Sequence, residues 1–156
     1  MTLRLEVAPR PIGAAMLFLW LALSACASAG PAAPEGVFLP SLTGAPPHYP
    51  SAAIGGTLVE DRGCLELRDP YLSAEFAPPS PGAVVLLLWP EGSRATRTEG
   101  GGLRVDAPDL PAAVTGRDLF IGGMFTSSLE DAEQKIGEPI PAACRVGLYW
   151  VATEQS

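Results

Sequence analysis

The sequence contains very few of the side chains on which most catalytic and metal sites depend. It has one histidine, His48, and only three cysteines in 156 residues. A serine or cysteine nucleophile needs a histidine base that a further group orients, and a structural zinc site needs four Cys or His ligands at short spacing. We therefore expect no catalytic residues, no metal, no cofactor and no enzymatic activity, and interpret His48 as a solvated linker side chain.

Basic residues are also scarce. Lysine occurs once, at Lys135, and the ten Lys and Arg residues are outnumbered by 17 Asp and Glu residues, which gives a net charge of −7 at pH 7. The sequence has no cluster of Lys or Arg. Because an acidic protein repels phosphate backbones, this composition argues against a nucleic-acid partner.

An uncharged apolar segment leads into the first cysteine. Residues 13–23 carry no charge, follow a weakly basic start, and run into Leu23-Ser24-Ala25-Cys26. Their length is typical of the apolar core of a signal peptide. The arrangement resembles a bacterial lipobox, so the chain is expected to be a bacterial lipoprotein with a signal peptide over residues 1–25.

Two other interpretations of this segment remain open. Residues 12–30 carry no charge, which is close to the roughly 20 apolar residues of a membrane-spanning helix, although Ala, Ser and Gly fill the last third. Residues 27–29 have the Ala-x-Ala form of an ordinary cleavage site. The position of Cys26 directly after Leu-Ser-Ala favours the lipoprotein.

The resemblance implies a lipid partner for Cys26. In bacterial lipoproteins the cysteine at this position receives a diacylglyceryl group and becomes the new N-terminus, and its amine is often acylated too. One buried acyl chain holds a protein only marginally, so two or three chains would anchor it durably. The mature chain would carry a net charge of −8. Because Ala27 and not aspartate follows, the resemblance implies the outer membrane in a bacterium with two membranes, and otherwise the outer face of the cytoplasmic membrane.

Residues 26–51 are rich in proline, alanine and glycine. Proline fixes φ and lacks a backbone N–H, so this stretch favours extended backbone over helix. We predict a tether over residues 26–51, followed by a single domain over residues 52–156. In an alternative interpretation, residues 37–39 pack against that domain.

The remaining residues read mostly as short strands. Two β-prone segments joined by Asp61-Arg62-Gly63 predict a hairpin, and residues 83–89 form a continuous apolar run typical of a strand buried on both faces. The predicted strands are residues 56–60, 64–68, 83–89, 94–98, 103–106, 119–121 and 144–152.

One short helix is predicted before the last strand. Ser127 and Glu130 have the spacing of a capping box, apolar residues from Leu129 to Ile136 share a face, and Gly137 suits the C-terminal cap. The order of elements predicts a mainly β domain, either a small antiparallel barrel or a sandwich. An OB-like barrel is possible, although its usual helix lies between the third and fourth strands.

The two remaining cysteines, Cys64 and Cys144, are expected to form a disulfide, because the cell envelope permits oxidation. The bond would close a loop of about 80 residues and stabilise the domain by about 4 kcal/mol in the chain-entropy model. Two buried free thiols are the alternative. Simple alternation places Cys64 opposite Leu65 and Leu67, so a bulge beside Gly63 is predicted to redirect it.

Three aromatic residues, Trp89, Tyr149 and Trp150, lie in predicted strands. An exposed ring among them could contact a partner protein or a glycan, whereas a buried ring would only pack. Short phrases such as residues 63–67, 86–90 and 140–144 resemble small uncharacterised bacterial lipoproteins, which carry no known activity. The expected function is a membrane-anchored, non-catalytic binding or envelope-associated domain; the alternative is a small envelope hydrolase that uses Asp and Glu side chains.

The first prediction concerns Cys26. Mass spectrometry of the membrane fraction should find this residue acylated at the N-terminus of the mature chain, and Cys26→Ser should release the protein from the membrane or stall its processing. An unmodified, soluble chain that begins at Gly30 would contradict lipidation.

Overall fold

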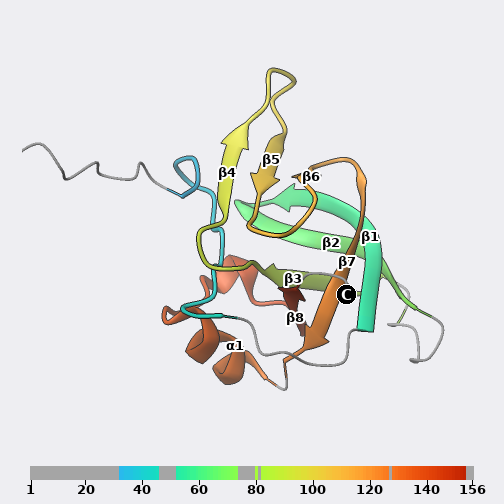
Figure 1. Cartoon of the computed structure of the whole chain (residues 1–156), viewed down its shortest axis with the longest axis vertical. Helices are drawn as coiled ribbons and strands as arrows, with labels where there is room; N and C mark the ends of the chain where they lie inside the picture. The colour runs from blue at the N-terminus through green and yellow to red at the C-terminus, as the bar shows by residue number, and fades with distance from the viewer. Residues whose placement is uncertain (1–31, 46–51, 74–79, 81, 127, 154–156) are drawn as a thin grey trace, which may run out of the picture. The chain divides into compact units, whose positions relative to one another are not determined.

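Five strands close into a barrel, with a smaller sheet and a helix packed around it (Figure 1). The computed structural model describes residues 32–45, 52–73, 80, 82–126 and 128–153. The barrel strands are β1 (Ala52–Asp61), β2 (Cys64–Leu72), β3 (Val84–Leu88), β7 (Asp118–Phe125) and β8 (Leu148–Thr153). The smaller sheet comprises β4 (Arg94–Arg97), β5 (Leu103–Asp106) and β6 (Ala113–Val114), and helix α1 (Leu129–Ile136) precedes β8. The prediction of a mainly β barrel with one short helix before the last strand is confirmed.

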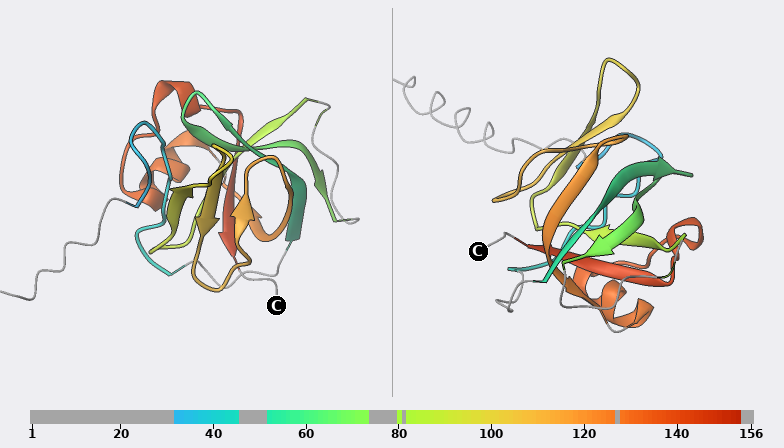
Figure 2. Two further views of the ribbon diagram at one scale, coloured as in Figure 1. Left: turned by 90° about the horizontal axis from the view of Figure 1, so that it is seen from above. Right: turned by 90° about the vertical axis from the view of Figure 1, so that its right-hand side faces the viewer.

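The barrel contains one parallel strand pair. β3 and β8 run parallel, with Val85 opposite Leu148, and the other four neighbouring pairs are antiparallel. Counting barrel strands alone, the order around the barrel is first, second, third, fifth, fourth, as in an OB-fold barrel. The helix differs from that fold, because it lies between the fourth and fifth barrel strands; Figure 2 shows it beside the barrel in two further views.

The predicted hairpin is present as β1 and β2. Asp61 pairs with Cys64, so Arg62 and Gly63 alone form the turn. Both have positive φ, 51° and 80°, which is the pattern of a type I′ turn. A Cβ atom on Gly63 would also lie 2.2 Å from the carbonyl oxygen of Gly36, so glycine is required here.

Strand β3 is buried on both faces, as its apolar run predicts. Val85 and Leu87 belong to the hydrophobic cluster inside the barrel. Leu86 and Leu88 belong to a second cluster outside the barrel wall, together with side chains of α1 and of the segment that follows it. The domain therefore has two apolar layers, one on each side of this strand.

The small sheet of β4, β5 and β6 covers part of the barrel interior. Its apolar side chains, such as Leu103 and Val105, pack in the same cluster as the inward residues of the barrel. Figure 1 shows the three strands above β3 and β8. Arg97 of β4 also binds Glu60 of β1, with Nη2 2.9 Å from Oε1. Strands β4 and β5 were predicted, whereas the two-residue β6 was not.

The N-terminal cap of α1 is Ser128, which corrects the predicted capping box of Ser127 and Glu130. The Ser128 hydroxyl accepts a hydrogen bond from the Asp131 backbone N–H at 3.1 Å. Ser127 lies outside the described residues. Two consecutive serines offer the same oxygen at adjacent positions, and the sequence alone does not decide between them.

The rest of the predicted helix is confirmed. Ala132 and Ile136 are buried, and Leu129 packs against the same cluster. Gly137 is the C-terminal cap, with φ of 73°, and its N–H binds the Glu133 carbonyl. Among the residues that the structure describes, no helix is long and apolar enough to cross a membrane.

Residues 32–45, which we call the N-terminal segment, pack along the barrel. The Phe38 N–H donates to the Gly63 carbonyl at 2.7 Å, and the Leu42 N–H donates to the Trp89 carbonyl at 2.8 Å. Leu42 is 5% exposed and belongs to the outer apolar cluster. This segment is therefore part of the folded domain.

The structure corrects the predicted boundary of the tether. The prediction assigned residues 26–51 to a spacer, with packing of residues 37–39 as the alternative, and the packed alternative is what the structure shows. Proline prevents helix formation but leaves carbonyls and neighbouring N–H groups free to bind other strands. The domain thus begins before residue 52.

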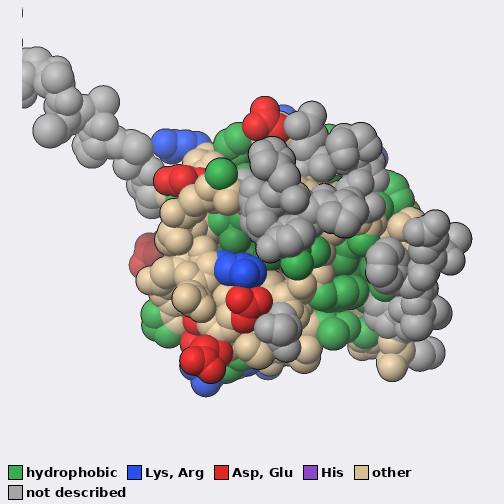
Figure 3. Space-filling view, turned by 60° about the horizontal axis from the view of Figure 1, so that its bottom comes forward, with side chains coloured by type: hydrophobic (Ala, Val, Ile, Leu, Met, Phe, Trp, Pro, Cys, Tyr) green, Lys and Arg blue, Asp and Glu red, His purple; other side chains and the backbone are tan. Residues whose placement is uncertain are grey.

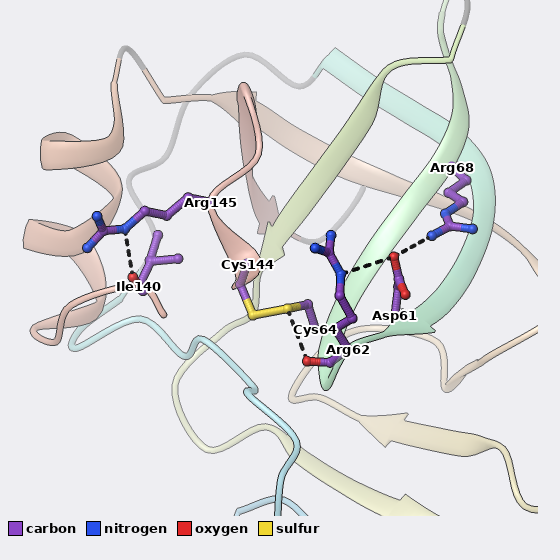
Figure 4. Close-up of a disulfide and its surroundings, with 7 residues drawn as sticks. All are labelled: Asp61, Arg62, Cys64, Arg68, Ile140, Cys144 and Arg145. Carbon is purple, nitrogen blue, oxygen red and sulfur yellow. Dashed lines mark hydrogen bonds and ion pairs between the residues drawn. A yellow bond between two sulfur atoms is a disulfide. The ribbon is translucent and has the colours of Figure 1, made fainter. Parts of the chain in front are cut away.

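Cys64 and Cys144 form a disulfide, with Cα atoms 5.4 Å apart (Figure 4). The bond joins the start of β2 to the 3-10 turn Ala142–Cys144, which follows α1. The last strand was predicted to begin at Cys144, and this is wrong. Cys144 precedes the strand, and β8 starts at Leu148. Side chains of α1, of the turn that carries Cys144 and of the N-terminal segment pack against the outer face of the barrel, and we call these elements the covering layer. The disulfide links this layer to the barrel wall.

The predicted bulge beside Gly63 is wrong. Leu65 and Leu67 face the barrel interior, whereas Cys64 faces the outer apolar cluster. Regular alternation therefore holds, and Cys64 is buried because the helix and the segment after it cover this side of β2. The prediction took the outer face of β2 to be exposed to solvent. The covering layer buries that face, so no bulge is needed to bury Cys64.

The second prediction concerns this bond. The double variant Cys64→Ala/Cys144→Ala should lose about 4 kcal/mol of unfolding free energy, because the unfolded chain regains the entropy of the 80-residue loop. Urea denaturation followed by tryptophan fluorescence measures the loss. As a control, reductant should destabilise the wild-type chain and leave the variant unchanged. Thiol labelling of both cysteines in the denatured, non-reduced wild-type chain would contradict the disulfide.

Candidate functional site

The aromatic residues singled out in the sequence are packing residues. Trp89 and Trp150 are fully buried and Tyr149 is 4% exposed. Trp150 donates a hydrogen bond from its ring nitrogen to the Gly122 carbonyl at 3.2 Å and makes an edge contact with Phe125. Of the two interpretations of these rings, the buried one is therefore confirmed.

The exposed aromatic residues are Tyr71 and Phe120. They are the large hydrophobic side chains most open to solvent in the described part of the chain, at 52% and 44% exposure. Their ring centres lie 6.2 Å apart and their planes differ by 21°. We call these two rings the aromatic pair. Figure 3 shows apolar side chains gathered on the side of the molecule where Figure 1 places β1 and β7.

An extra residue in β2 turns Tyr71 outward. Gly55 pairs with Tyr71 and Thr57 pairs with Arg68, so two steps along β1 match three steps along β2. This is a β-bulge, and Asp69 within it has a φ of 50°. Without the extra residue, Tyr71 would follow Leu67 into the barrel interior. The bulge therefore exposes an aromatic ring at the cost of a left-handed backbone position, which Asp tolerates better than most residues.

In the sheet, Gly55 is paired between residues 71 and 120, and its lack of a side chain lets the Tyr71 ring approach the backbone. On β1 it pairs with Tyr71 on one side and with Phe120 on the other. A Cβ atom at this position would lie 2.1 Å from Cζ of Tyr71. The Tyr71 ring therefore lies directly against the backbone of β1, and any side chain at residue 55 would displace it.

A row of polar side chains borders the aromatic pair on the same face of the sheet. Thr57 lies two residues after Gly55 on β1, and it pairs with Arg68 on β2 and with Asp118 on β7. The Thr57 hydroxyl donates a hydrogen bond to Oδ1 of Asp118 at 2.9 Å. We call these three residues the polar row. The Arg68 guanidinium also binds Asp61, at 2.8 Å.

One carboxyl near the disulfide has an altered acidity. Glu66 is 2% exposed, and no hydrogen-bond partner for its Oε1 atom is found within the described residues. Burial raises the pKa of Glu66 and the nearby Asp61 raises it further, whereas Arg68 and Arg62 lower it. Figure 4 shows these two arginines and Asp61 beside the disulfide.

Two sequence-predicted positions cannot be placed. Cys26, the predicted lipidation site, and His48 lie outside the described residues. Cys64 and Cys144 are brought together, as predicted. Within the described ranges, no group of three or more His, Cys, Asp and Glu side chains could hold a metal ion.

Sequence reasoning missed the aromatic pair. Tyr71 follows Asp69-Pro70, a dipeptide typical of a turn, so the strand was expected to end at Arg68. Phe120 lies in a predicted strand, but its side of the sheet depends on pairing with Gly55, which is 65 residues away in the sequence. The positive φ of Asp69 has no signal in one sequence.

The chain was compared with protein-family models, curated proteins and solved structures. No family model, no curated protein and no solved structure matches this chain.

The third prediction concerns Glu66. Its pKa is raised in the folded protein above the usual 4.5, so the stability that its protonated form supplies is full below that value and is lost as pH rises through the folded value. Glu66→Gln, which stays uncharged, should therefore unfold at higher urea than wild type at pH 7 and at the same urea at pH 3.

The matched control for Glu66 is Glu91→Gln, at an exposed turn position. It should leave the pH dependence of stability unchanged. If Glu66→Gln is no more stable than wild type at pH 7, the burial of the Glu66 carboxylate is not a cost to this fold.

Proposed function

We propose that this chain is a lipid-anchored protein of the bacterial cell envelope whose β-barrel domain is a non-catalytic binding module. The anchor is Cys26, for which the lipobox-like sequence is the support. The binding surface is the aromatic pair. The observation that carries this proposal is the bulge at Asp69. It places Asp69 in an unfavourable left-handed conformation and exposes the Tyr71 ring, which regular alternation would bury.

The arrangement of the barrel supports this choice of surface. In OB-fold proteins, ligands bind on the face of the second and third strands. Here Cys64 on β2 and Leu86 and Leu88 on β3 are buried on that face beneath the covering layer. The sheet of β7, β1 and β2 keeps its outer face open at the aromatic pair, so a ligand has access there.

A small envelope hydrolase that uses Asp and Glu side chains is the second candidate. The raised pKa of Glu66 favours it, because a general acid must hold its proton near neutral pH. A general acid must also reach its substrate. Glu66 is 2% exposed, whereas the aromatic pair is open to solvent, so the binding module is the better supported function.

The fourth prediction tests the binding surface in cells. A benzophenone-bearing phenylalanine analogue at position 120 abstracts hydrogen from C–H groups of any neighbouring molecule when illuminated. It should form adducts in the membrane fraction, and Tyr71→Ala should reduce their yield severalfold, because the pair is one surface.

The matched control places the same analogue at Thr96, an exposed residue of β4. It should give few adducts. Equal yields from positions 120 and 96 would reject the aromatic pair as a binding surface. If the Cys26→Ser chain instead stays in the membrane fraction and gives adducts equal in kind and yield to those of wild type, Cys26 is rejected as the anchor and the binding surface is left in place.

A further inference from the structure

We propose that the aromatic pair and the polar row bind a neutral saccharide chain, with sugar rings lying flat on Tyr71 and Phe120. This inference rests on the proposed binding function and adds the class of ligand.

The planes of the two rings are nearly parallel. Their planes differ by only 21°, and their centres are 6.2 Å apart. Atoms in face-to-face contact lie about 3.5–4.0 Å apart, so rings with centres 6.2 Å apart do not fully cover each other, and both side chains stay about half exposed. Each ring therefore presents part of one face to solvent. Gly55 makes this possible, because it leaves the Tyr71 ring directly on the sheet.

A hexopyranose ring has the shape and polarity that such a surface fits. One of its faces carries several C–H groups, whose slightly positive hydrogens are attracted by the negative face of an aromatic ring. Burial of that face also removes apolar area from water. Hydroxyl groups stand around its edge and need hydrogen-bond partners once they leave water.

The polar row offers those partners at the right distance. It lies about two strand residues from the aromatic pair, or roughly 7 Å, at about 3.3 Å per residue. The Asp118 carboxylate accepts hydrogen bonds, and the Thr57 hydroxyl, which donates to Asp118, still accepts. Arg68 supplies further donors beyond its pair with Asp61. Hydrogen bonds to these charged groups are the stronger kind.

The observations disfavour other occupants. A stable protein interface buries about 1,200–2,000 Å², whereas a Tyr or Phe side chain buries at most about 250 Å², so two half-exposed rings do not make one. The chain is acidic, with a net charge of −7, and repels anionic lipid surfaces and nucleic acids. A neutral ligand meets no such repulsion.

The test is isothermal titration of the full chain with two soluble probes, cellotetraose and the tetramer of N-acetylglucosamine. The chain is held in a detergent without a sugar head group. We expect at least one probe to bind. Tyr71→Ala and Phe120→Ala should each weaken that binding about tenfold, which corresponds to about 1.4 kcal/mol. Tyr71→Phe and Phe120→Tyr keep both rings and should stay within about twofold of wild type.

Gly55→Ala tests the geometry without removing a ring. Its Cβ would lie 2.1 Å from Tyr71 Cζ, so the ring must move off the sheet. The backbone there does not have positive φ, and the exposed ring has room to turn away. Affinity should fall about tenfold, whereas Glu91→Ala, in the turn after β3, should leave it unchanged. If Gly55→Ala fails to fold, the single-ring variants decide the question.

Two outcomes would overturn the saccharide and leave the binding function standing. In the first, neither probe binds, and the analogue at position 120 still forms adducts. Those adducts are digested by protease or contain lipid, so the ligand is a protein or a lipid. The second is ring-dependent self-association in sedimentation, or ring-dependent binding to phosphatidylglycerol vesicles. Probe binding that Tyr71→Ala and Phe120→Ala leave unchanged would also overturn it. Absence of adducts at position 120 would remove the proposed binding surface itself.

Discussion

The domain depends on the burial of both faces of β3. A five-stranded barrel encloses only a small interior. Of the apolar side chains of β3, Val85 and Leu87 point into it. Leu86 and Leu88 need a second cover. The helix, the turn that carries Cys144 and the N-terminal segment together provide it. Because these pieces are far apart in sequence, the Cys64–Cys144 bond is the covalent link that keeps the cover on the barrel.

This cover also decides where the molecule can meet a ligand. It lies over the outer side of β2 and β3 near Cys64, and leaves the side chains of Tyr71 and Phe120, on either side of Gly55, exposed to solvent. The two sides of the barrel wall therefore differ in role. One is a second hydrophobic core, and the other is the candidate site.

Local signals in the sequence predict much of the fold but little of the site. The turn residues Arg62 and Gly63, the apolar run of β3 and the Gly137 cap each act within a few neighbouring residues, so the pattern reveals them. The parallel pairing of β3 with β8, the packing of residues 32–45 and the two-residue β6 depend on contacts between distant segments. The bulge at Asp69 is local in sequence, yet only its pairing with β1 shows that Tyr71 points outward.

The position of the first domain contact limits how far the barrel can stand from a lipid anchor. The carbonyl of Ala32 accepts a hydrogen bond from the Ala95 N–H at 2.7 Å, so the chain is already held to the domain at this residue. Six residue steps separate Ala32 from Cys26, and a fully extended chain covers at most about 3.6 Å per step, or about 22 Å in all. A domain lipidated at Cys26 would thus work within the layer next to the head groups, and could not sample the full depth of the envelope.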